Sequence, residues 1–275
     1  MPARRHISLR LNKALSGRSG IRPSDLRGEG STFDSLRPYH PDDEFRRINW
    51  QATARANEPV SNVYREERNQ QVLILLDCGR TMATSISGQS RYEYALDSCM
   101  GLAELAGHLG DHVGVLAFGA KPRVVIPPRS GRAHVRLILD QLFDLSPTLE
   151  APNYRSAFAL LLARFRRRAL LVLLTDLTQP AAMENLFQAV TALVTRHLLI
   201  VASITDPAIS LLARTAPETS SQAYLKAAAE ESLLNRERAA RKLGYLGAMV
   251  IDRDPTELSG RLADEYLRIK AQGRL

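Results

Sequence analysis

The apolar residues of this chain follow two alternating patterns after about residue 70. Short continuous apolar runs, such as the one at 71–76, are typical of strands buried on both faces. Longer segments repeat apolar residues every three to four positions, as amphipathic helices do. The predicted strands are residues 71–76, 113–118, 123–126, 169–175, 197–204 and 247–251. The predicted helices are residues 90–107, 133–143, 154–165, 181–195, 223–243 and 256–270.

Buried strands that alternate with helices predict an α/β fold, a doubly wound and mostly parallel sheet covered on both faces. The short connection at 119–122 predicts one hairpin within it. Before residue 70, Pro, Gly, Arg and Asp dominate and the periodicity is weak, which predicts an irregular N-terminal extension. We therefore divide the chain into a basic, flexible arm (1–27), a segment packed on the main domain (28–70) and the main domain (71–275).

The charge and the length of the apolar runs narrow the classes of partner. The net charge of +8 suits an acidic partner and leaves a basic nucleic-acid-binding module as an alternative. The densest basic cluster, Arg164 with Arg166, Arg167 and Arg168, ends a predicted helix and complements its dipole. It lacks the repeated interleaving of stacking aromatic residues that single-strand binders require, so we do not expect nucleic acid to bind there. No apolar run reaches the roughly 20 residues of a membrane span and no export signal is visible, so we expect a cytoplasmic protein.

The chain has two cysteines, Cys78 and Cys99, which we expect to be reduced thiols. Cys99 lies within a helical pattern and is expected to pack in the core. Cys78 has no obvious histidine partner, which argues against a catalytic thiol.

Two buried strands end in an aspartate. Asp77 follows the first strand and Asp176 follows the strand at 169–175. Strand ends of a parallel sheet share one edge, so we expect the two carboxylates to face each other. Together with the hydroxyl group of Thr81 they form an oxygen-only set of the kind that binds Mg²⁺. The alternative is that the aspartates cap helices, with Asp176 capping the helix at 181–195.

An enzyme is the other functional class that these residues leave open. A metal-dependent phosphohydrolase would use Asp77 and Asp176, with Asp77 as the nucleophile. The phosphotransferase pattern D-x-D-x-T has Gly79 here in place of its second aspartate, so the general acid is missing. The chain also lacks a phosphate-binding loop, a G-x-S-x-G motif and an H-E-x-x-H motif. His108 and His112 stand four apart across Gly110, which predicts a solvated helix end, not a metal site. We therefore do not expect catalysis.

The segment before the first buried strand carries a specific signature. It contains F-D-S-L-R-P-Y at 33–39, R-I-N-W at 47–50, A-T-A-R at 52–55 and E-E-R at 66–68. Such a segment can be ordered by bridges between arginines and carboxylates and by burial of Tyr39 and Trp50. The residues that we assign to the signature are Arg37, Tyr39, Asp43, Arg47, Trp50, Arg55, Glu66 and Glu67.

This signature resembles that of the domain-of-unknown-function family 58, whose members are similar to von Willebrand factor A domains and are associated with MoxR-type AAA+ ATPases. The resemblance covers residues 28–275. It implies a bacterial adaptor or scaffold that acts with a MoxR-like AAA+ ATPase in the assembly or maturation of an unknown client protein.

The resemblance also implies a metal-ion-dependent adhesion site, carried here by Asp77, Thr81 and Asp176. The site is degenerate, because Gly79 stands where the pattern has a serine ligand. Asn153 falls near the position of a further ligand. We therefore expect Mg²⁺ to bind weakly or only together with a partner.

Overall fold

The computed structural model describes residues 32–40, 43–65 and 69–274. These residues form two compact units. The sheet unit comprises residues 69–264, and the hairpin unit comprises the described residues of 32–65 together with 265–274. No helix in the described part of the chain combines the length and the apolarity needed to cross a bilayer.

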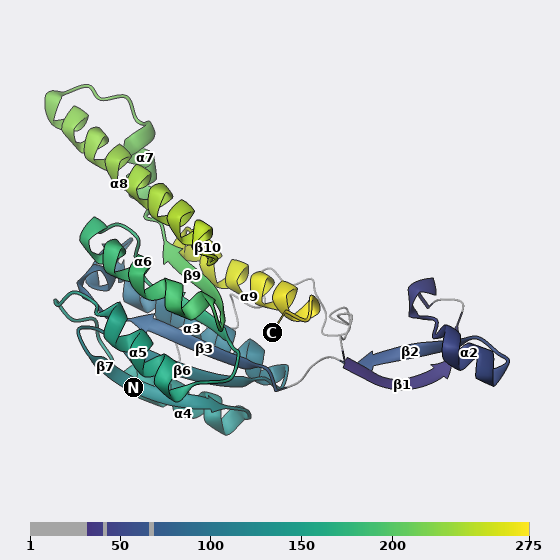
Figure 1. Ribbon diagram of the computed structural model, residues 1–275. Helices are drawn as coiled ribbons and strands as arrows, with labels where there is room; N and C mark the ends of the chain where they lie inside the picture. Colours follow the sequence, from purple (N-terminus) through teal and green to yellow (C-terminus); the bar gives the residue numbers. More distant parts are fainter. Residues whose placement is uncertain (1–31, 41–42, 66–68, 275) are drawn as a thin grey trace. The chain divides into compact units, whose positions relative to one another are not determined.

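A six-stranded sheet forms the centre of the sheet unit, with the strand order β10-β9-β8-β3-β6-β7 (Figure 1). All neighbouring strands pair in parallel except β7, which pairs antiparallel with β6 and forms the predicted hairpin. All six predicted strands are present, with ends shifted by a few residues. They are β3 (Gln71–Asp77), β6 (His112–Phe118), β7 (Pro122–Arg129), β8 (Leu170–Leu174), β9 (Leu198–Ile204) and β10 (Met249–Arg253).

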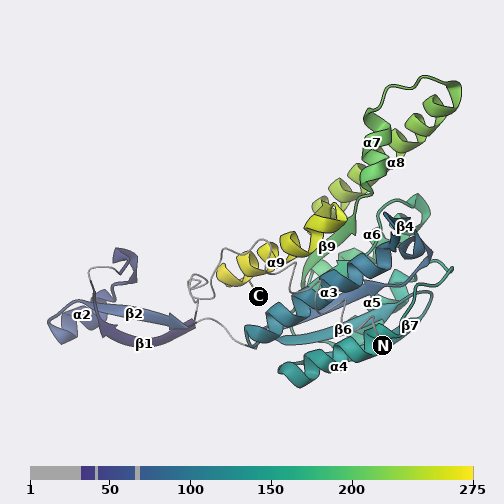
Figure 2. The same ribbon diagram turned by 180° about the vertical axis from the view of Figure 1, so that it is seen from behind.

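Helices cover both faces of this sheet, as the alternating pattern predicts (Figures 1 and 2). One face carries α3 (Arg91–His108), α4 (Arg132–Phe143) and the first part of α9 (Pro255–Ala271). The other carries α5 (Tyr154–Arg164), α6 (Pro180–Val194) and α8 (Ser220–Tyr245). The side chains of β3 and β8 are buried on both faces, which explains their uninterrupted apolar sequences. The doubly wound α/β fold is therefore confirmed.

Several short elements escaped the sequence pattern. Residues 207–214 form α7 (Pro207–Arg214), which Asp206 caps and which packs along α8. The hairpin of α7 and α8 extends beyond the sheet (Figure 1). After β3 the chain forms the 3-10 helix η2 (Arg80–Ala83) and a small hairpin of β4 (Ser85–Ile86) and β5 (Gln89–Ser90). These segments are too short to show a period.

The hairpin unit is more regular than its sequence suggests. Strands β1 (Thr32–Pro38) and β2 (Val60–Arg65) pair antiparallel. Between them lie the 3-10 helix η1 (Phe45–Arg47) and α2 (Trp50–Ala56). The Asn49 side chain caps α2 by accepting a hydrogen bond from the Ala52 backbone N–H at 2.9 Å. The prediction that this segment packs on the main domain stays a prediction.

The expected burial of Trp50 does not occur within the hairpin unit, and its burial against the main domain stays a prediction. The residue is 60% exposed, and its ring meets the ring of Phe45 edge to face with 5.6 Å between centroids. Phe45 is itself 69% exposed. The sequence could not show this, because an aromatic residue in an irregular segment carries no periodic signal of the face it lies on. Tyr39 is half-buried.

Candidate functional site

The strand-end aspartates lie where the direction of the sheet connections reverses. After β3 the chain continues to β6 and β7 on one side, and β8, β9 and β10 follow on the other. Open α/β sheets bind ligands at such a switch point, beyond the carboxyl ends of the strands. Asp77 ends β3, and Asp176 follows its neighbour β8 by two residues.

The register of the sheet gives the two aspartates different partners. Leu76 pairs with Leu174, so the residue that comes level with Asp77 is Thr175, not Asp176. The Thr175 hydroxyl donates to Asp77 Oδ2 at 2.6 Å. The Tyr154 hydroxyl, from the start of α5, lies 3.2 Å from the same oxygen and 2.9 Å from Thr175 Oγ1. Asp77 is therefore held by a buried hydroxyl pair.

The other Asp77 oxygen is also engaged. The backbone N–H of Gly79 donates to Oδ1 at 2.7 Å. Burial raises the pKa of the Asp77 carboxyl to about 6, against the opposing effect of the Thr175, Gly79 and Tyr154 hydrogen bonds. The nearby charge of Asp176 raises this pKa further. With no exposed surface, the Asp77 carboxylate is out of reach of a substrate that it would attack as a nucleophile.

Asp176 belongs to a buried ion-pair network. Its Oδ1 lies 2.9 Å from Nη1 of Arg236, and its Oδ2 lies 3.6 Å from Nη1 of Arg91. Thr178 also donates to Oδ2, through its hydroxyl and its backbone N–H. The alternative that Asp176 caps α6 is wrong, because the residue at that N-cap is Gln179.

Arg236 joins three strand ends to α8. Its guanidinium group donates to Asp252 of β10 at 2.5 Å and to Ser203 of β9 at 2.9 Å, in addition to Asp176. Burial lowers the pKa of Arg236, but the charges and hydrogen bonds of Asp252 and Asp176 bring it above its ordinary value.

Sequence reasoning missed Arg236, although a signal existed. The buried residues of α8 are Ala229, Arg236, Ala239 and Leu243, so the arginine stands on the apolar stripe at helical spacing. An arginine on such a stripe indicates a buried charge that needs an acidic partner.

The residues around the two aspartates do not fit a divalent metal ion as they are arranged. A Cβ atom at Gly79 would lie 2.6 Å from Cδ of Pro152 and 3.0 Å from Asp77 Oδ1, so Pro152 fills the space of a serine ligand. Asn153 caps α5 by accepting from the Ser156 N–H at 3.0 Å. Thr81 is buried in η2. Within the described residues, no three His, Cys, Asp or Glu side chains form a group that could hold a metal.

Both thiols are buried in the core. Burial raises the pKa of Cys78 and of Cys99 to about 12 each, and the neighbouring Asp77 adds to the shift of Cys78. Neither thiol is therefore an available nucleophile at neutral pH, in line with the packing role expected for Cys99.

Asp43 organises the signature segment in the hairpin unit. Its carboxylate lies 2.5 Å from Nη2 of Arg37 and accepts from the His40 backbone N–H at 2.9 Å. The Tyr39 hydroxyl donates to the Asp43 backbone oxygen at 3.2 Å. The expected bridge between an arginine and a carboxylate is thus present.

For the remaining signature residues, the structure gives the position of two and does not describe the other two. Arg47 lies in η1, and Arg55 is exposed in the last turn of α2. The predictions for Glu66 and Glu67 lie outside the described residues.

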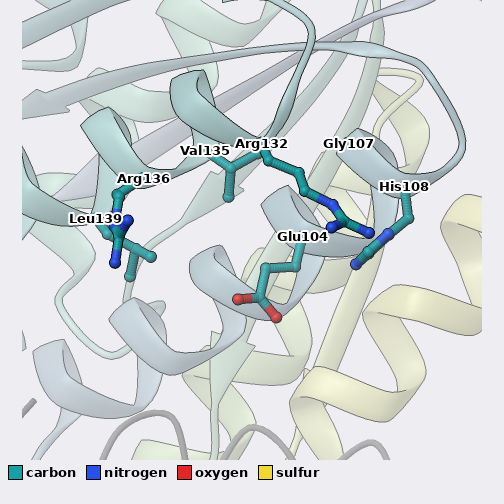
Figure 3. A pocket seen from close by; sticks show the side chains of 7 residues that line it. All are labelled: Glu104, Gly107, His108, Arg132, Val135, Arg136 and Leu139. Carbon is teal, nitrogen blue, oxygen red and sulfur yellow. The ribbon is translucent and has the colours of Figure 1, made fainter.

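A surface pocket of about 360 Å³ lies away from the strand ends, between α3 and α4 (Figure 3). Arg132 extends across it toward His108 in the figure. His112 stands in β6, so the two histidines spaced four apart belong to different elements. The pocket is lined by Glu104, Gly107, His108, Arg132, Val135, Arg136 and Leu139.

Comparison with known proteins identifies relatives of unknown function. A family described as "Protein of unknown function DUF58" matches residues 35–239, which confirms the resemblance read from the signature. Uncharacterized proteins Mb1516 of Mycobacterium bovis and Rv1480 of Mycobacterium tuberculosis are each 23% identical over 182 residues, covering 66% of this chain. The match covers 56% of each of them, so the chain spans about half the length of these curated relatives.

Solved structures similar to this chain include von Willebrand factor A domains. BatB from Bacteroides thetaiotaomicron is 14% identical, with a TM-score of 0.46 and coverage of 74% of this chain and 100% of that one. The SpRpn10 VWA domain is also 14% identical, with a TM-score of 0.43 and coverage of 72% and 95%. Mussel byssus proximal thread matrix protein 1, with a zinc-occupied MIDAS motif, is 9% identical with a TM-score of 0.40, covering 74% and 46%. At these identities the likeness concerns the fold alone.

Proposed function

The chain belongs to the family of proteins of unknown function DUF58, and from this premise we propose that it is a non-catalytic adaptor or scaffold. It acts in the cytoplasm with a MoxR-like AAA+ ATPase in the assembly or maturation of a client protein. The burial of the strand-end carboxylates is the observation that carries this proposal. Asp77 and Asp176 are 0% and 2% exposed, and protein donors engage both, so neither is free to attack or activate a substrate.

The loops above these carboxylates form the partner-binding face. The Arg80 backbone N–H donates to the Glu150 carbonyl at 2.9 Å, and the Arg80 guanidinium group donates to Gln179 Oε1 at 2.9 Å. Three loops, following β3, preceding α5 and following β8, are thereby joined. Leu149 stands 86% exposed next to Glu150. An exposed leucine beside a fixed arginine and glutamine suits a protein partner better than a small molecule.

Capture of the ATPase tests this proposal. The purified full chain, immobilised, is expected to retain a MoxR-like AAA+ ATPase from the same organism. Leu149→Asp and Arg80→Glu are expected to reduce capture about tenfold or more, as truncation of a central contact residue does. Tyr245→Asp is the matched control, because Tyr245 is 91% exposed and is the last residue of α8.

Two outcomes contradict the proposal. One is capture that the Leu149 and Arg80 variants leave unchanged, which refutes the assigned face. The other is metal-dependent hydrolysis of phosphoesters by the purified chain that Asp77→Asn abolishes, which shows a phosphohydrolase.

A further inference from the structure

The strand-end site contains a cation that the protein itself supplies. Nη1 of Arg236 lies 2.9 Å from Asp176 Oδ1, and Nη1 of Arg91 lies 3.6 Å from Oδ2. The Arg236 side chain is 3% exposed and the Arg91 side chain is 6% exposed. A buried guanidinium group is stable only when paired, so these two arginines are specific parts of the site.

The N–H groups of Arg236 and the oxygens that accept from them match one another. Asp252 Oδ1 lies 2.5 Å from Nη2, and the Ser203 hydroxyl accepts from the same nitrogen at 2.9 Å. Two aspartates therefore balance two arginines around the carboxyl ends of β8, β9 and β10. The fork of guanidinium N–H groups spans several acceptors at fixed angles, as a metal ion spans several oxygen ligands.

We propose that the guanidinium group of Arg236, together with that of Arg91, takes the place of a divalent metal ion, so that the strand-end site of this chain is metal-independent. The proposal goes beyond the adaptor function and does not depend on the identity of the partner.

Three features exclude a divalent ion from the same space. The two guanidinium groups repel a second cation. The oxygens of Asp77 already accept from Thr175, Tyr154 and the Gly79 N–H, so a metal would have to displace these donors. Pro152 fills the position from which a serine at residue 79 would reach the ion. Mg²⁺ requires about six oxygen ligands in near-octahedral geometry, which this arrangement does not supply.

The replacement has a structural consequence for α8. A bound metal ion can leave, whereas Arg236 is covalently part of the helix and ties it permanently to β8, β9 and β10. A partner that contacts this edge therefore binds equally well with and without divalent cations.

A first experiment measures metal binding to the wild-type chain. The unfolding temperature is recorded with EDTA, with Mg²⁺ and with Mn²⁺, and bound Mn²⁺ is measured by electron paramagnetic resonance. We expect no shift in the unfolding temperature and no saturable Mn²⁺ binding. Saturable binding that Asp77→Asn or Asp176→Asn removes would overturn the proposal. These measurements need no partner, so they succeed or fail separately from the capture experiment.

A second experiment tests whether Arg236 acts as the cation of the site. Arg236→Met leaves Asp176 short of one positive charge and is expected to lower the unfolding temperature. Adding Asp176→Asn to it removes the unbalanced charge, so the double variant is expected to unfold at a higher temperature than Arg236→Met alone. Arg238→Met, at an exposed position of the same helix, is the matched control and is expected to have no effect.

The opposite order of stabilities contradicts the proposal. If the double variant is no more stable than Arg236→Met, the contribution of Arg236 is packing and not charge balance. If Arg236→Met does not fold, the metal measurements on the wild-type chain still decide the question.

Discussion

The surroundings of the Asp77 carboxyl group favour its protonated form. Burial raises its pKa from 3.8 to about 6. Because the folded-state pKa lies above the unfolded one, Asp77 stabilises the fold fully below about pH 3.8. This stabilisation is lost as the pH rises through about 6. At neutral pH the folded protein therefore holds the charged form at a cost.

This cost predicts a change in the pH dependence of stability. Asp77→Asn removes the titration, so between about pH 4 and 7 the wild-type free energy of unfolding should fall by up to about 3 kcal/mol relative to the variant. Urea denaturation of both proteins at a series of pH values measures this difference in the free energy of unfolding. Glu150→Gln, at an exposed acid, is the control. Parallel pH profiles for wild type and Asp77→Asn would refute the prediction.

The individual residues also show where sequence reasoning stopped. It placed Asp77 and Asp176 at the same edge of the sheet, because both end apolar strands. It also expected the two carboxylates to face each other, but that depends on the register between β3 and β8, which brings Thr175 level with Asp77 instead. A shift of one residue turns a side chain to the other face. The Thr175 hydroxyl reaches Asp77 through this register, whereas Arg236, 60 residues beyond Asp176, reaches Asp176 through the packing of α8.

At the scale of elements, long periodic segments were predictable and short ones were not. The six strands and six helices of the pattern all formed, and only the last part of α9 lies outside the sheet unit. The α7 helix has eight residues, and its sequence contains too few turns for a period to show. The elements of the hairpin unit are short as well, and their stability comes from caps and pairings such as Asn49 on α2. Such contacts depend on local geometry, which a pattern of hydrophobic residues does not show.

The loop from β3 into η2 yields a prediction at this scale. Gly79→Ser restores the missing serine of the metal-site pattern, but its Cβ would lie 2.6 Å from Cδ of Pro152. We expect the variant to be about 1–3 kcal/mol less stable, as overpacked cores are, and to gain no Mg²⁺ binding. Chemical denaturation and calorimetric titration with Mg²⁺ measure these two effects.

A matched glycine serves as the control for this variant. Gly101 lies in α3 with no atom within 4 Å of an added Cβ, so Gly101→Ser should leave the stability nearly unchanged. A Gly79→Ser variant that is as stable as wild type and binds Mg²⁺ would show that Pro152 moves aside and that the degenerate site can be repaired.

For the whole molecule, the open question is whether its two units unfold together. The sequence predicts that the segment at 28–70 packs on the main domain. The hairpin unit has its own ion pair, cap and strand pairing, yet a two-stranded hairpin with a short helix is marginally stable alone. The sheet unit instead buries a large core between its two helix layers. The two units therefore start from very different intrinsic stabilities.

We expect the hairpin unit to open at a lower free energy than the sheet unit. Hydrogen exchange of the full chain, followed by mass spectrometry at increasing denaturant, measures this for each segment. Amides of β1 and β2 should exchange through a local opening that costs several kcal/mol less than the opening of β3 and β8. Amides of α6, which lies wholly in the sheet unit, serve as an internal reference and should follow β3. Equal opening free energies in all of these segments would instead show one cooperative body, in which the signature segment is held by the main domain as the sequence predicts.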